Sequence, residues 1–68
     1  METTDIWFAA FLKHKGFSIV DYSVLGKGRG RYKFDISQEE YKKQKMLFIN
    51  SEISKIKQNM EEIKDLLY

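Results

Sequence analysis

The last third of this 68-residue chain carries apolar residues whose spacings alternate between four and three. These residues are Ile49, Ile53, Ile56, Met60, Ile63 and Leu67. This is the a/d pattern of a helix that packs along one seam against another helix. The chain contains no proline, and no glycine follows Gly30. The sequence therefore predicts one long helix over 38–68, since nothing forces it to break.

A chain of this length has little other structure with which to cover such a seam. We therefore expect the seam to be an oligomer interface, in a homodimer or a higher bundle. Isoleucine at both the a and the d positions of the seam favours a bundle of more than two helices. The alternative is a break at Asn50-Ser51, whose polar side chains can compete for the helix backbone. The seam residues would then fold back on the first helix of the same chain.

Composition predicts a folded chain without a metal or a cofactor. Hydrophobic residues make up 43% of the sequence and the net charge is only +2, which is not the composition of a disordered chain. There is no cysteine, and the single histidine, His14, cannot build a zinc site alone. The longest apolar run, Ile6–Leu12, is far shorter than the roughly 20 residues of a membrane span. No secretory signal pattern precedes it, and we expect a cytoplasmic protein.

The first predicted element is a helix over 4–15. Thr3 or Thr4 can cap it, and Asp5 in the first turn suits the helix dipole. Basic residues in the last turn followed by Gly16 predict where the helix ends. The helix body is apolar nearly all round, which predicts that it is covered on more than one side.

A two-stranded β-hairpin is predicted over 17–36. Alternating residues of the first strand, Phe17–Leu25, share one face, namely Val20, Tyr22 and Val24. Ile19 does not fit this alternation, which predicts a bulge or bend beside it. The second strand alternates charged and apolar residues from Arg31 to Ile36, and the glycines of Gly26–Gly30 form the tip.

A capping box marks the start of the long helix. Ser37 is the cap residue and Glu40 stands three positions later. The predicted fold is thus a single α+β domain over 1–68, with an N-terminal helix, a hairpin and a long C-terminal helix with a heptad seam.

Several segments resemble a known family. They are Thr4–Leu12 with Gly16-Phe17, Tyr32–Asp35, Phe48–Glu52 and Ile63–Tyr68. Together these segments resemble a family of short phage and prophage proteins that is classed as a domain of unknown function. The resemblance implies a helix–hairpin–helix fold and an origin in a phage or mobile element. It implies no activity and supplies no catalytic residue.

Basic residues around the hairpin tip form a candidate nucleic-acid contact. They are Lys27, Arg29, Arg31 and Lys33, which Lys42 and Lys43 of the following helix would extend. A flexible basic finger of this kind can lie along the phosphates of DNA or RNA. The alternative is a soluble loop whose charges protect a sheet edge from aggregation. A nucleotide-binding loop is not expected, because Gly26–Gly30 is followed by a strand instead of a helix.

The sequence does not favour an enzyme. His14 lies among lysines at a helix end, and adjacent glutamates such as Glu61 and Glu62 lie about 100° apart around a helix and do not converge. Trp7 is expected in the core and not at an interface. The first functional hypothesis is a non-catalytic oligomeric interaction protein that binds a protein partner, with inhibition of a host factor as one form of this role. The second is a small oligomeric nucleic-acid-binding protein that uses the basic hairpin.

Overall fold

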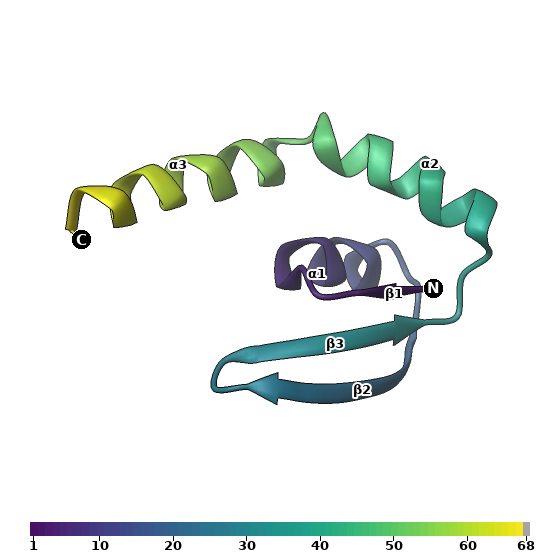
Figure 1. Cartoon of the computed structure of the whole chain (residues 1–68). Helices are drawn as coiled ribbons and strands as arrows, with labels where there is room; N and C mark the ends of the chain where they lie inside the picture. Colours follow the sequence, from purple (N-terminus) through teal and green to yellow (C-terminus); the bar gives the residue numbers. More distant parts are fainter. Residues whose placement is uncertain (68) are drawn as a thin grey trace.

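The computed structural model describes residues 1–67 and has three layers, with the first helix in the middle (Figure 1). Its elements are β1 (Glu2–Thr3), α1 (Ile6–His14), β2 (Ile19–Gly26), β3 (Arg29–Phe34), α2 (Gln38–Ile49) and α3 (Glu52–Leu67). The sheet lies on one side of α1, and α2 and α3 lie on the other. The α+β class is confirmed, and α1 is covered on two sides as its apolar sequence predicts.

Both ends of α1 are fixed by local chemistry. Asp5, not a threonine, is the N-cap, and its Oδ1 accepts hydrogen bonds from the backbone N–H groups of Trp7 and Phe8 at 2.9 and 3.3 Å. The helix therefore begins at Ile6, later than predicted. At its other end Gly16 has φ +99°, as a left-handed stop requires. The N–H of Gly16 donates to the carbonyl of Lys13, and the N–H of Phe17 donates to the carbonyl of Leu12. These two bonds form a Schellman motif.

The sheet has three antiparallel strands in the order β1-β3-β2, and the prediction of two strands is thereby corrected. The additional strand, β1, pairs Glu2 with Lys33 and Thr3 with Tyr32. Two residues are too few to show an alternating pattern, so no periodicity in the sequence predicts this strand. The predicted bulge beside Ile19 is confirmed by a register shift between Ile19 and Asp21.

The core lies between α1, β3 and α2. Its buried apolar residues are Phe8, Ala9, Phe11, Leu12, Phe34 and Phe48. The ring of Phe48 lies 5.2 Å from that of Phe8 and 5.4 Å from that of Phe11, within the range of favourable aromatic pairs. The sequence predicts Trp7 in the core, and it is half-buried and packs against this cluster from its edge.

The C-terminal region is helical but not continuous, which corrects the prediction of one helix over 38–68. The predicted cap Ser37 is confirmed, since its Oγ accepts from the N–H of Glu40 at 3.1 Å. The helix then ends at Ile49, because the Nδ2 of Asn50 donates to the carbonyl of Met46. The Oγ of Ser51 donates to one helix and accepts from the next, which separates α2 from α3. Tyr68, the predicted last residue of the helix, lies outside the described residues.

Candidate interaction surfaces

The break between α2 and α3 divides the predicted seam into residues with different surroundings. Ile49 lies on α2, before the break, and is exposed. Ile53 packs against the core, and Met60 is half-buried. The remaining seam residues stay exposed, namely Ile56, Ile63 and Leu67. Part of the seam therefore folds back within the chain, as the alternative interpretation predicted, and part does not.

The exposed apolar side of α3 is here named the α3 stripe and consists of Ile56, Ile63 and Leu67. Ile63 is 59% exposed and Leu67 is 76% exposed. No residue of α3 is buried over its described range of 52–67. Figure 1 shows that the last turns of α3 extend beyond α1. The α3 stripe is thus an apolar helix surface that its own chain leaves uncovered.

A second apolar surface lies on β2. Tyr22 pairs with Tyr32, and Val24 pairs with Gly30, so Tyr22 and Val24 share the sheet face that β3 turns toward the core. They are nevertheless 69% and 76% exposed. Ile6 of α1 lines the same depression, whose volume is about 420 Å³. We name this depression, formed by Ile6, Tyr22, Val24, Gly30 and Tyr32, the β2 groove.

The floor of the β2 groove depends on a glycine. A Cβ on Gly30 would lie only 3.0 Å from the Oη of Tyr32, so the tyrosine ring can lie across the backbone only where a side chain is missing. The sequence pattern placed Tyr22 and Val24 on one face. It could not show that α1 leaves this face uncovered.

The structure separates the predicted basic residues instead of gathering them. Arg29 lines the β2 groove, and Lys27 lies in the turn at the hairpin tip. Arg31 and Lys33 lie on the opposite face of the sheet, in register with Ser23 and Asp21. Lys42 and Lys43 lie on α2, which follows the end of β3 that is remote from the tip (Figure 1).

Acidic groups partly neutralise the basic residues of the sheet. The Nε of Arg31 lies 4.0 Å from a carboxylate oxygen of Glu2. Lys33 stands between Glu2 on β1 and Asp21 on β2 in the strand register. A phosphate backbone would therefore meet a mixed surface here and not an uninterrupted cationic one.

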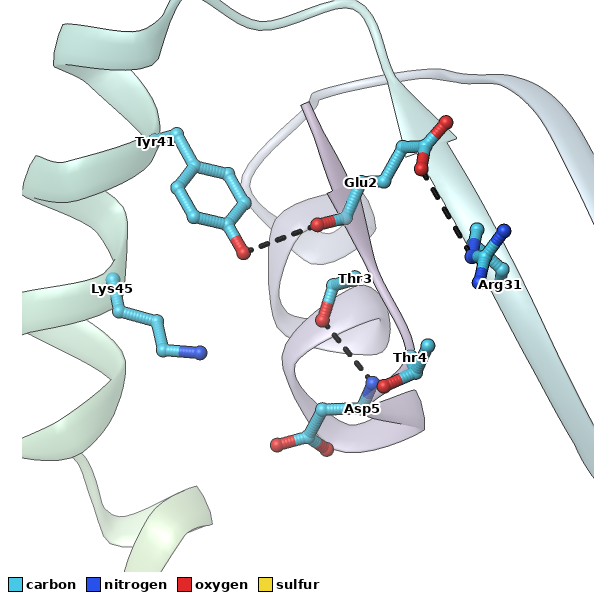
Figure 2. Close-up of a pocket in the computed structure, with 7 residues that line it drawn as sticks. All are labelled: Glu2, Thr3, Thr4, Asp5, Arg31, Tyr41 and Lys45. Carbon is cyan, nitrogen blue, oxygen red and sulfur yellow. Dashed lines mark hydrogen bonds and ion pairs between the residues drawn. The ribbon is translucent and has the colours of Figure 1, made fainter.

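A polar pocket of about 390 Å³ lies between β1 and α2. It is lined by Glu2, Thr3, Thr4, Asp5, Arg31, Tyr41 and Lys45 (Figure 2). The carboxylate of Glu2 points toward Arg31, on the far side of β1 from that of Asp5. Tyr41 donates its hydroxyl to the Glu2 carbonyl at 3.3 Å, and the Nζ of Lys45 lies 4.7 Å from the centre of the Phe8 ring.

These contacts give the polar pocket a structural role. Its two carboxylates do not converge on a shared point, as a pair for acid–base catalysis must. Its tyrosine and lysine are engaged with β1 and with the core. The hydrogen bond from Tyr41 to Glu2 at this pocket therefore joins α2 to β1.

Among residues 1–67, no three side chains of the metal-binding types gather at one place. His14 is exposed in the last turn of α1. Within the same residues, none of the helices has the length and apolar character needed to cross a membrane.

No protein-family model, no curated protein and no solved structure matches this chain. The structure itself therefore carries the functional argument.

Proposed function

We propose that this chain is a non-catalytic, oligomeric interaction protein that self-associates through the α3 stripe. The single observation that carries the proposal is the exposure of this stripe on a helix that has no buried residue over 52–67. Isolated helices of about this length are marginal in water and gain most of their stability from packing of an apolar face. A second apolar surface against the stripe would supply that packing.

The total surface area supports the same proposal. The chain exposes 5468 Å². A folded monomer of 8.1 kDa is expected to expose only about 4,500 Å². The excess of roughly 1,000 Å² is close to the ~800 Å² that each partner buries in a stable interface.

A protein partner that binds the assembled surface belongs to the same proposal. We also propose that this chain comes from a phage or mobile element and that its partner is a host factor that it inhibits. The origin is proposed on the resemblance of the sequence to the phage and prophage family alone. A cytoplasmic location likewise stays a prediction.

The test is the solution mass by light scattering on a sizing column, at several concentrations. We expect at least twice the chain mass of 8.1 kDa for the wild-type protein. Ile63→Glu places a charge in the α3 stripe and should lower the mass to that of one chain. Gln58→Glu adds the same charge to another face of α3 and should leave the oligomer intact. A wild-type protein that is monomeric at every concentration contradicts the proposal.

Nucleic-acid binding is the second candidate function, and one observation favours it. Arg31 and Lys33 project from the same solvent face of β3, as residues that contact successive phosphates do. Replacement of Arg31 and Lys33 by alanine should then abolish retention on DNA or RNA and leave the mass unchanged. Absence of wild-type retention at about 50 mM salt removes this candidate.

A further inference from the structure

We infer that the β2 groove is the docking site for α3 of a second copy of this chain, in a reciprocal exchange. This inference rests on the proposed self-association and adds the surface that receives the α3 stripe. A direct contact between two α3 helices is the competing arrangement.

The sheet has room for one more helix. Strands lie about 4.8 Å apart, so three strands present a width that two helices, spaced 8–10 Å apart, can cover. Among residues 1–67, α1 is the helix that packs on this face (Figure 1). It packs near β1 and β3, whereas β2 lies farthest from it (Figure 1). A second helix placed beside α1 would cover Tyr22 and Val24 and would contact Ile6.

The chain's own α3 is held away from the β2 groove. The Nζ of Lys57 donates to Oδ2 of Asp5 across 2.8 Å, which joins α3 to the start of α1. In this position α3 and the sheet lie on opposite sides of α1 (Figure 1). Only α3 from another copy can therefore fill the groove while this ion pair is kept.

The helix end that carries the stripe and the hairpin tip beside the groove have opposite net charges. Residues 61–67 carry Glu61, Glu62 and Asp65 against one lysine, a net charge of −2, and these acidic residues lie on the sides of α3 turned away from the stripe. At the mouth of the β2 groove, Arg29 lines the depression and Lys27 lies in the adjacent turn. An acidic helix end thus meets a basic hairpin tip. Such rim charges fix the orientation of a partner more than they add affinity.

The exchange also produces a closed dimer with two-fold symmetry. If α3 of one copy enters the β2 groove of the other, a two-fold axis makes the reverse contact identical. Each copy then gives one helix surface and receives one. The two contacts together can cover the excess of roughly 1,000 Å² that each chain exposes.

The experiment compares two single variants by light scattering and sedimentation. Val24→Glu blocks the groove, and Ile63→Glu blocks the stripe. Each should weaken dimerisation by more than about tenfold, because each buries an unpaired charge. Both positions are exposed within one chain, so far-UV circular dichroism should show the wild-type fold. Ser23→Glu, on the opposite face of β2, is the matched control for Val24→Glu and should keep the dimer.

Mixing the two variants gives the decisive result. The Val24→Glu chain keeps an intact α3 and the Ile63→Glu chain keeps an intact groove, so one of the two contacts is restored in a mixed dimer. Detection of that mixed dimer, by energy transfer between labelled chains, supports the exchange. Two monomeric variants that do not combine overturn it.

The remaining outcomes separate this inference from the proposed function. If Ile63→Glu is monomeric and Val24→Glu is dimeric, the groove is not the receptor and self-association through the α3 stripe stands. If both variants keep the wild-type dimer, the inference and the proposed function both fail.

Discussion

Lys57 and Asp5 form an ion pair of 2.8 Å between two helices that are 52 positions apart in the sequence. The same Asp5 carboxylate caps α1 through its other oxygen. One side chain therefore begins the first helix and positions the last one. This contact requires the break at Asn50 and Ser51, because the change of direction there brings α3 beside the start of α1.

The two roles of Asp5 can be separated by substitution. Asp5→Asn keeps a capping oxygen and loses the charge, whereas Asp5→Ala loses both. We expect Asp5→Ala to lower the free energy of unfolding by about 1 kcal/mol or more, and Asp5→Asn by less. Urea unfolding at fixed protein concentration measures both. Equal losses would show that the cap contributes nothing beyond the ion pair.

The pKa of Asp5 predicts a dependence of stability on pH. Burial raises the pKa of this carboxyl, but the Lys57 hydrogen bond, the N–H groups of Phe8 and Trp7, and the charge of Lys57 outweigh burial and hold it below the ordinary 3.8. A lowered pKa in the folded state stabilises the fold above the unfolded-state pKa. This contribution declines as the pH falls below 3.8 and through the folded-state value.

The measurement is the difference in unfolding free energy between wild type and Asp5→Asn at a series of pH values. Because the asparagine does not titrate, the difference isolates this carboxyl. It should be constant between pH 5 and pH 7, about one unit and more above the ordinary carboxyl pKa, and should shrink in more acidic buffer. A difference that does not change with pH would contradict the assignment.

Phe48 joins α2 to α1, and its removal should unfold much of the population. It is buried against Phe8 and Phe11. Phe48→Ala is expected to cost about 3–5 kcal/mol, a large part of the total stability of so small a domain. The adjacent Leu47 is exposed, so Leu47→Ala is the matched control and should cost less than about 1 kcal/mol. Thermal unfolding by circular dichroism compares them.

The break between α2 and α3 should depend on its two polar side chains. Asn50→Ala with Ser51→Ala removes the side-chain bonds at the break and favours a continuous helix. A straight helix would carry Lys57 away from Asp5. We expect helical carbon chemical shifts at residues 50 and 51 and loss of the contact between these two side chains in NMR spectra. Unchanged shifts would mean that tertiary packing alone keeps the break.

The sequence predicts those elements whose signals are local. Gly16 ends α1, Ser37 begins α2 and Ile19 marks a bulge, and each of these predictions is confirmed. Each depends on the backbone chemistry of a few adjacent residues, so one sequence is enough to recognise it.

Features that depend on distant packing were not predictable in this way. The side chains of Asn50 and Ser51 favour a break, and contact of Ile53 and Lys57 with α1 and its cap, which the local sequence does not show, adds to that preference. The uncovered face of Tyr22 and Val24 depends on the position of α1 across the sheet. Periodicity shows which residues share a face, but not whether another element covers that face.

The central position of α1 also sets the order in which the chain can fold during synthesis. Its buried residues Phe8 and Phe11 need Phe34 beneath them and Phe48 above them. The ribosome makes α1 long before either of these partners. The apolar side chains of α1 therefore stay exposed until β3 and α2 have been made and can pack against them. Among the helices of residues 1–67, α1 is made first and is not buried until α2 follows, so a chaperone that binds short apolar helices would meet it exposed.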